Sequence, residues 1–159
     1  MKKRVLITGA NGLLGRSIIS CNENRFELLA TGKQKSSTTD TDSLYTPLDI
    51  LDSNQCDKVF SKYKPDYVIH AAAMTNVDKC EEDSYACNLV NVDGTNNILK
   101  ACENYGSHLI FISTDFIFDG DHGSYSENSK PNPISIYGTS KWNAEKLIKA
   151  STINLSLIH

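Results

Sequence analysis

Short apolar runs rich in branched side chains alternate along this chain with segments whose apolar positions recur at helical spacing. Runs of this kind are typical of strands that are buried on both faces of a sheet. The runs predict strands over Arg4–Thr8, Glu27–Thr31, Tyr45–Ile50, Tyr67–Ala71, His108–Ser113 and Ile153–Ile158. The helical spacing predicts helices over Leu13–Ser20, Ser53–Tyr63, Asp83–Asn104 and Tyr137–Ala150.

Strands that alternate with helices predict an α/β fold, here a three-layer, doubly wound parallel sheet. Right-handed crossovers would bring the carboxyl ends of the strands to one edge of that sheet. Ligands of such sheets bind at this edge, near the point where the strand order reverses. Gly9, Ala71–Ala73, Ser113 and Thr114 all lie at strand ends, so we expect them to converge on one binding site.

The composition is that of one folded domain. The chain has 159 residues and a formal charge of −3, with 40% hydrophobic and 22% charged residues, as in ordinary globular proteins. The sequence contains neither an apolar run long enough for a membrane span nor the apolar region of a signal peptide. A pI of about 5.8 argues against nucleic acid as a partner. Five cysteines and four histidines show no metal-ligand spacing, which favours reduced thiols, no metal site and a cytoplasmic location.

A glycine-rich turn follows the first predicted strand and opens the first predicted helix. It reads Gly9-Ala10-Asn11-Gly12-Leu13-Leu14-Gly15. Gly9 would permit the tight turn, Gly12 would let a pyrophosphate approach the backbone, and Gly15 would let the helix pack closely. The helix N-terminus would add free N–H groups and the positive end of the helix dipole. In this context the motif predicts dinucleotide binding, with a merely structural turn as the alternative.

The segment after the second predicted strand favours NADPH over NADH. NAD enzymes usually place an acidic residue there to bind the ribose 2′-hydroxyl, but none occurs between Glu27 and Asp40. Lys33 and Lys35 are suited to bind a 2′-phosphate instead. The alternative is a solvated loop with two unrelated lysines, and NADH stays open as the other cofactor.

Three side chains form a candidate catalytic set. Tyr137 and Lys141 are four residues apart on a predicted helix, so their side chains share one face. A nearby ammonium group would lower the pKa of Tyr137 and make it an acid–base group near neutral pH. Thr114, with Ser113 as the next candidate, is placed to hydrogen-bond a substrate oxygen from a strand end. Taken alone, these motifs also fit a surface pair and a strand-end cap.

The spacing G-x-x-G-x-x-G resembles the extended branch of the short-chain dehydrogenase/reductase superfamily, and PNPISIYGTSKWNAE (131–145) looks like its active-site helix. Segments 70–81, 91–95 and 113–120 are similar to the dTDP-4-dehydrorhamnose reductase family. The resemblance covers residues 4 to about 150. It implies a Rossmann-like fold, NADPH or NADH as cofactor, and reduction of a dTDP-linked 4-keto-6-deoxy sugar on the way to dTDP-L-rhamnose.

The resemblance also implies roles for single residues. Tyr137 would be the proton donor, Lys141 would lower its pKa and hold the nicotinamide ribose, and Thr114 would bind the substrate oxygen. Asp49 and Ile50 would meet the adenine. The full set of expected cofactor contacts is Gly9, Asn11, Gly12, Leu13, Leu14, Gly15, Lys33, Asp49, Ile50, Ala71, Ala72, Ala73, Asn91, Ser113, Tyr137 and Lys141.

One residue departs from the family pattern, and two other functions stay open. His70 stands where many members carry asparagine, and we interpret this lone histidine as structural rather than catalytic. An epimerase or dehydratase of a nucleotide sugar would share Tyr137 and Lys141. A non-catalytic NADP-binding subunit, resembling the β subunit of methionine adenosyltransferase, would keep a similar fold. The intact set of Thr114, Tyr137 and Lys141 favours the reductase.

The last part of the chain carries further expectations. The polar stretch Asp119–Ser135 predicts a mobile loop beside the substrate. The family's substrate lobe comes largely from later residues, so we interpret 1–159 as an incomplete nucleotide-binding domain, inactive by itself. Residues 151–159 are either a last strand or a non-native tail, since LSLIH (155–159) matches a peptide that a sequencing adapter encodes. The expected partners are a nucleotide sugar and, for a full-length protein, a second copy in a homodimer.

Overall fold

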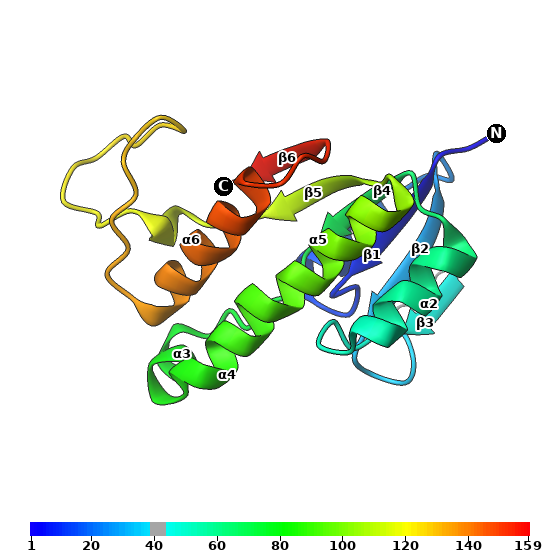
Figure 1. Cartoon of the computed structure of the whole chain (residues 1–159), viewed down its shortest axis with the longest axis horizontal. Helices are drawn as coiled ribbons and strands as arrows, with labels where there is room; N and C mark the ends of the chain where they lie inside the picture. The colour runs from blue at the N-terminus through cyan, green and yellow to red at the C-terminus, as the bar shows by residue number, and fades with distance from the viewer. Residues whose placement is uncertain (39–43) are drawn as a thin grey trace.

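The computed structural model describes residues 1–38 and 44–159, and its centre is one six-stranded parallel sheet (Figure 1). The strands are β1 (Arg4–Thr8), β2 (Glu27–Gly32), β3 (Leu44–Pro47), β4 (Tyr67–His70), β5 (His108–Ile112) and β6 (Leu155–Ile158). Their order is β3-β2-β1-β4-β5-β6, and each neighbouring pair is parallel. The order reverses between β1 and β4, so the predicted doubly wound, Rossmann-like sheet is confirmed.

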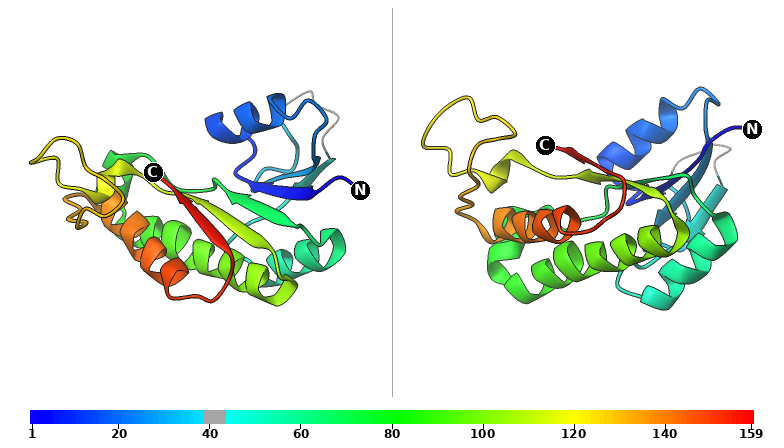
Figure 2. Two further views of the ribbon diagram at one scale, coloured as in Figure 1. Left: turned by 90° about the horizontal axis from the view of Figure 1, so that it is seen from above. Right: turned by 45° about the horizontal axis from the view of Figure 1, so that its top comes forward.

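Helices cover both faces of the sheet. They are α1 (Leu13–Ser20), α2 (Ser53–Tyr63), α3 (Val77–Glu82), α4 (Ser84–Asn88), the π-helical η1 (Leu89–Asp93), α5 (Gly94–Tyr105), the 3-10 turn η2 (Asp115–Ile117) and α6 (Ile136–Lys149). Figure 2 shows α1 on one face and α2, α5 and α6 on the other. No helix in the described part of the chain is long and apolar enough to cross a membrane.

The alternation of strand side chains builds a separate core on each face. Leu6, Val68 and Leu109 are buried in the cluster that includes residues of α2, α5 and α6, whereas Ile7 packs with Ile19 on the α1 face. Because α1 is the one helix that the described residues place on its face, the sheet there is less completely covered. A cavity of about 540 Å³ on this face is bordered by apolar side chains, among them Ile18, Phe26, Tyr67, Ile69 and Ile110.

The prediction of one regular α-helix over Asp83–Asn104 is wrong, although the segment is helical. The structure divides it into α4, η1 and α5, and a separate helix α3, which the pattern did not predict, precedes it. The side chains of Asn76 and Asp83 cap α3 and α4 by accepting the N–H groups of Lys79 and Ala86. The Asp83 cap therefore starts α4 as a helix separate from α3. Within the segment, the π-helical η1 interrupts the regular helix between α4 and α5 by placing one extra residue in its turn.

The third strand is also shorter than predicted, because it ends at Pro47 instead of Ile50. The Leu48 N–H still donates to the Gly32 carbonyl at 2.8 Å. The chain then turns, with the Asp49 carboxylate accepting the N–H of Leu51 at 3.0 Å. This turn takes Asp49 and Ile50 out of the sheet and to the carboxyl edge.

Candidate nucleotide-binding and active site

The glycine-rich turn between β1 and α1 packs directly against the segment after β4. Gly9 has a φ of +68°, and a Cβ atom there would lie 2.8 Å from the backbone of Ala72. Only glycine fits such a position without strain. A Cβ on Gly15 would lie 2.5 Å from the Gly9 carbonyl oxygen, so α1 approaches this closely because the side chain is missing. The turn and packing roles predicted for Gly9 and Gly15 are confirmed.

A cavity of about 600 Å³ lies at the carboxyl edge of the sheet, beside this turn. Of the expected cofactor contacts, those that line it are Gly9, Asn11, Gly12, Leu13, Leu14, Gly15, Lys33, Asp49, Ile50, Ala71, Ala72 and Ala73. Residues that sequence reasoning missed also line it, namely Gly32, Gln34, Leu48, Leu51, Thr75, Val90 and Ile112. No motif marks them, since strand ends and turns bring them together. Five expected site residues are outside the lining: Asn91, Ser113, Thr114, Tyr137 and Lys141.

The walls of this cavity suit a dinucleotide. Gly12 is the N-cap of α1, and no side chain in the described residues caps that end, so its first N–H groups are available to an anion. A Cβ on Gly12 would meet only the Gly9 carbonyl oxygen, at 3.2 Å, which leaves room for a pyrophosphate. Leu13 is 80% exposed, an apolar surface that a bound cofactor would cover.

One ion pair lies within the lining. Lys33 Nζ is 3.1 Å from Asp49 Oδ2, with both groups partly exposed. Burial raises the pKa of Asp49, but hydrogen bonds from the Leu51 amide and from Lys33, together with the charge of Lys33, hold it below its usual value. The Lys33–Asp49 pair therefore lies at the cavity wall. Lys35, the other candidate for a 2′-phosphate, is outside the lining.

Asn11 serves the loop beside the cavity. Its Nδ2 donates to Gln34 Oε1 and to the Ser36 carbonyl, both at 3.1 Å. Its Oδ1 accepts the N–H of Thr38 at 3.0 Å. The side chain therefore ties the glycine turn to the segment after β2, a role that the sequence did not indicate for a residue expected to hold the pyrophosphate.

Tyr137 and Thr114 meet where α6 faces the end of β5. Tyr137 is 9% exposed and packs in a cluster with Cys80 and Cys87. Burial raises its pKa, a hydrogen bond with Thr114 lowers it in part, and the net result is a pKa above the usual value. The expectation that Lys141 lowers this pKa is wrong for this structure. The reason is that the Lys141 ammonium is directed elsewhere.

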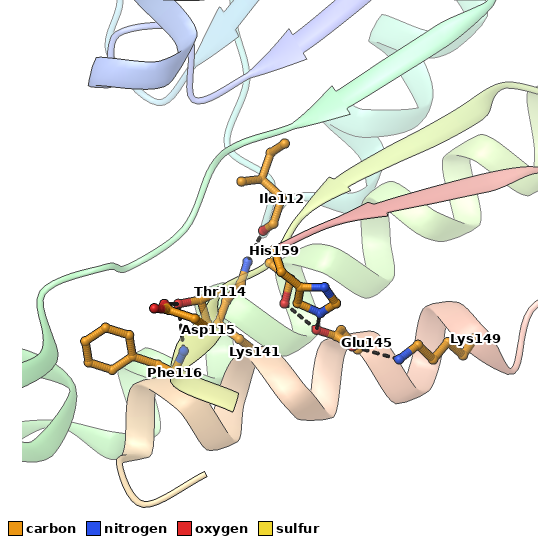
Figure 3. Close-up of polar contacts among 9 residues, drawn as sticks. Ile112, Thr114, Asp115, Phe116, Lys141, Glu145, Lys149 and His159 are labelled. Atoms are coloured by element: carbon orange, nitrogen blue, oxygen red, sulfur yellow. Dashed lines mark hydrogen bonds and ion pairs between the residues drawn. The ribbon is translucent and has the colours of Figure 1, made fainter. Parts of the chain in front are cut away.

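Lys141 extends from α6 to the end of β5. Its Nζ donates to the Ile112 carbonyl at 2.6 Å (Figure 3). The same atom lies 4.0 Å from the centre of the Phe111 ring. The residue is 3% exposed. Burial lowers its pKa to about 8, and the charge of Glu145 opposes this by raising it. Lys141 does not line the cavity, but Ile112 does. The Lys141 ammonium therefore contacts the backbone of a lining residue.

His70 is structural in its contacts, in agreement with the prediction. It is 1% exposed, with Nδ1 2.7 Å from Thr8 Oγ1 and Nε2 3.0 Å from Thr95 Oγ1. The Thr95 hydroxyl donates to the Asn91 carbonyl at 2.7 Å, so we assign the proton to Nε2 of His70 and the acceptor role to Nδ1. The Thr8 hydroxyl oxygen accepts the Ala72 N–H at 3.2 Å.

Asn91 continues this buried network toward α6. Its Nδ2 donates to Ser140 Oγ at 2.9 Å and to the Met74 carbonyl at 3.0 Å, while its Oδ1 accepts the Met74 N–H at 2.8 Å. The Ser140 hydroxyl donates to the Tyr137 carbonyl at 2.7 Å. All polar positions of the Asn91 side chain are thus used inside the protein. Its place in the sequence indicated a cofactor contact, whereas the structure places it between the β4 loop and the Tyr137 helix.

His70 is expected to make the fold sensitive to acid. Burial, reinforced by the charge of Lys141, lowers its pKa to about 3, against about 6.5 in an unfolded chain. Between these values the unfolded state binds a proton that the folded state excludes, so stability is lost as the pH falls below about 6.5. We expect this residue to remove about 1–2 kcal/mol of unfolding free energy between pH 7 and pH 5.

Urea unfolding at the two pH values measures this loss. His70→Asn should show a smaller difference between them, whereas the exposed loop control His122→Asn should behave like the wild type. An equal pH dependence for His70→Asn and the wild type would contradict the prediction.

Hydrogen bonds within the polar stretch Asp119–Ser135 converge on the carboxylate of Asp119. The Asp119 carboxylate accepts hydrogen bonds from the Tyr125 hydroxyl and from Asn132 Nδ2, the latter at 2.8 Å. These hydrogen bonds, with one from the Asp121 amide, lower the pKa of Asp119 to about 2. The ring of Tyr125 stacks on that of Phe118, with centroids 4.6 Å apart. Most of the stretch is exposed, and its mobility stays a prediction.

The chain matches the family described as "RmlD substrate binding domain" over residues 2–158. The chain belongs to this family. The resemblance predicted from the motifs is confirmed.

Relatives of this family member include both enzymes and a subunit. A dTDP-4-dehydrorhamnose reductase of Aggregatibacter actinomycetemcomitans is 34% identical over 148 residues, which cover 91% of this chain and 46% of that protein. Methionine adenosyltransferase 2 subunit beta of Bos taurus is 31% identical over 157 residues, covering 98% of this chain and 46% of that protein. A crystal structure of the Bacillus anthracis dTDP-4-dehydrorhamnose reductase in complex with NADP gives a TM-score of 0.88 at 33% identity, over 99% of this chain and 52% of that one. The chain thus spans about half the length of these relatives.

Proposed function

We propose that this chain is the nucleotide-binding domain of an NADPH-dependent reductase that acts on a dTDP-linked 4-keto-6-deoxy sugar, as a dTDP-4-dehydrorhamnose reductase does. The observation that carries the proposal is the position of Ile112. Ile112 lines the cavity beside the glycine turn, and its carbonyl oxygen accepts a hydrogen bond from Lys141 Nζ. The cavity that would take the dinucleotide and the proposed catalytic residues Thr114 and Tyr137 are therefore at the same edge of the sheet. The NADP complex of the B. anthracis relative supports the choice of cofactor.

Four groups of residues in the cavity lining would each hold one part of the cofactor. The glycine turn and the start of α1 would hold the pyrophosphate, and Asp49 with Ile50 would meet the adenine. Lys33 would pair with the 2′-phosphate, while Ala71–Ala73 would border the nicotinamide ribose. When bound, the reduced nicotinamide supplies a hydride to the sugar keto carbon.

Tyr137 and Thr114 would handle the oxygen of that keto group. The raised pKa of Tyr137 means that the phenol carries its proton at neutral pH, as a general acid must. Thr114 would hydrogen-bond the same oxygen and orient it toward the phenol. Lys141 would supply positive charge behind the site. The proton would thus pass from Tyr137 Oη to the oxygen that becomes the sugar hydroxyl.

Two measurements test this function. Titration of the chain with NADPH, followed by calorimetry, tests the cofactor. Oxidation of NADPH by a full-length version, with the dTDP-keto sugar made in situ, tests the reaction. NADPH binding with turnover would support the proposal, and a full-length version that binds NADPH but reduces none of the sugar would argue against it.

Cofactor selectivity gives a prediction for Lys33. Lys33→Ala removes the ammonium group that faces the cavity, so we expect NADPH binding to weaken by about threefold to fivefold, near the upper value for one exposed charge pair. NADH binding should change by less than about twofold, since NADH lacks the phosphate. The matched control Lys35→Ala removes the same charge outside the lining and should leave both dissociation constants unchanged. Equal losses for the two nucleotides would contradict the role given to Lys33.

A regulatory subunit is the second candidate, because the Bos taurus β subunit matches 98% of this chain at 31% identity. In that case the domain would bind the nucleotide without turnover and would associate with a methionine adenosyltransferase. Size-exclusion chromatography of a full-length version with the catalytic subunit from the same source separates the candidates. Co-elution without sugar reduction would favour the subunit, and reduction without co-elution would favour the enzyme.

A further inference from the structure

One face of α6 holds two successive residues at the end of β5, Ile112 and Ser113. Tyr137, Lys141 and Glu145 are spaced by four, so they form one row along the helix. Figure 3 shows Lys141 and Glu145 directed at the strand end from adjacent turns. Lys141 donates to the Ile112 carbonyl and Glu145 accepts the Ser113 hydroxyl. The Thr114 hydroxyl accepts the Phe116 N–H at 3.2 Å and is near enough to Tyr137 to lower the pKa of that phenol in part. The proposed reaction gives roles to Tyr137, Thr114 and Lys141. It gives no role to the contact between Glu145 and Ser113.

Glu145 is a fully buried carboxylate with several donors. Its side chain is 0% exposed, and Lys149 Nζ donates to Oε2 at 2.8 Å. Ser113 Oγ donates to Oε1, and His159 Nε2 lies 2.9 Å from the same atom. Burial raises the pKa of Glu145, but hydrogen bonds from Lys149, Ser113 and His159 outweigh it and hold the pKa below its usual value. The contacts with Ser113 and Lys149 do not depend on the last residue of the chain.

The Glu145 carboxylate also acts on Lys141, because its negative charge favours the protonated form of the lysine. From β4, His70 faces Lys141 but is neutral, and from β5 the lysine meets the Phe111 ring and a carbonyl. From α6, the negative charge of Glu145 acts on the lysine and favours its protonated form. A buried ammonium is costly unless an opposite charge compensates it. Among the described residues, Glu145 is the carboxylate that acts on Lys141 in this way.

We propose that Glu145 is a positioning residue, which fixes the carboxyl end of β5 through Ser113 and supplies the counter-charge of the Lys141 ammonium. The inference deepens the proposed function, on which its catalytic meaning rests. Its structural content can be tested separately, because it concerns the charge on Lys141 and the placement of Thr114 in the chain as it stands.

The main test is the titration of Lys141 in Glu145→Gln. Glutamine keeps the shape of the side chain, and its one oxygen can still accept the Ser113 hydroxyl, so the variant removes the charge together with the Lys149 contact. Chains with ¹³C-labelled lysine are titrated by NMR, and the Lys141 signal is assigned as the one missing in Lys141→Arg. We expect a midpoint near pH 8 in the wild type and one lower by about one pH unit or more in Glu145→Gln.

Matched variants separate charge from general damage. Glu145→Asp restores the charge and should recover most of the shift, and Glu103→Gln, on the exposed side of α5, should leave the Lys141 midpoint unchanged. Ser113→Ala tests the other half without touching the charge. It should move the amide signals of Thr114 and Tyr137 while the Lys141 midpoint moves by less than about 0.3 units.

An unshifted Lys141 midpoint in a folded Glu145→Gln chain would overturn the counter-charge. Should that variant fail to fold, Glu145→Asp and Ser113→Ala still decide the matter, since unchanged Thr114 and Tyr137 signals in Ser113→Ala would overturn the role given to Ser113. The proposed function fails differently, by absence of NADPH binding in a wild-type chain whose Lys141 titrates as expected.

Discussion

Tyr137→Phe is expected to lower the rate of sugar reduction in a full-length version by about 10²–10⁴, the usual contribution of a general acid. The phenyl ring keeps the packing of Tyr137 against Cys80, Cys87 and the edge of Phe116. The variant loses only the hydroxyl that meets Thr114 and would deliver the proton. Steady-state kinetics with NADPH as the varied substrate measures the loss, which should fall on kcat.

The same experiment needs a control for the chemical change. Tyr85→Phe removes a hydroxyl from a tyrosine that is 76% exposed, and we expect its rate to equal that of the wild type. NADPH affinity should differ little among the three proteins, because Tyr137 is outside the cavity lining. Turnover above about a tenth of the wild-type value in Tyr137→Phe would exclude it as the acid.

Lys141→Met is expected to stabilise the fold by about 2–3 kcal/mol at pH 7. Burial lowers the pKa of Lys141 to about 8, against about 10.4 in an unfolded chain. The folded state therefore loses stability as the pH falls from about 10.4 to 8, and the full loss persists below that range. Methionine fills the same space without the charge, and the lost hydrogen bond to Ile112 offsets about 1 kcal/mol of the gain.

Urea unfolding at pH 7 and pH 10 checks both the size and the sign. The advantage of Lys141→Met should shrink at pH 10, where the wild-type amine is neutral in the folded state. Lys146→Met, on the exposed side of the same helix, should change stability little at either pH. A destabilised Lys141→Met would show that the ammonium contributes more through its contacts than burial removes. A stabilised but inactive variant would fit a residue kept for function.

Local pattern determined most of the fold. The apolar runs at β1, β2, β4 and β5 are long enough and branched enough to be strands on propensity alone, and their alternation with helices leaves few topologies. The glycine turn was readable because its requirements are local: a positive φ at Gly9 and a close helix at Gly15. The sequence was less informative at 83–104, where a π-helical turn interrupts an apolar period that reads as one helix.

The tertiary structure alone decided the electrostatics and the contacts of the site. Tyr137 and Lys141 are four residues apart on one helix, and the sequence therefore suggested that they act on each other. In the structure, burial raises the pKa of the Tyr137 phenol, and the Lys141 ammonium donates to the Ile112 carbonyl at the end of β5. The pairing of Lys33 with Asp49 joins two strand ends that are far apart along the chain. Periodicity reports which face a residue occupies, and a pKa depends on desolvation and on charges brought near by folding. The sequence therefore determined which groups reach this edge of the sheet, and the packing of α6 against β5 determined their partners and charge.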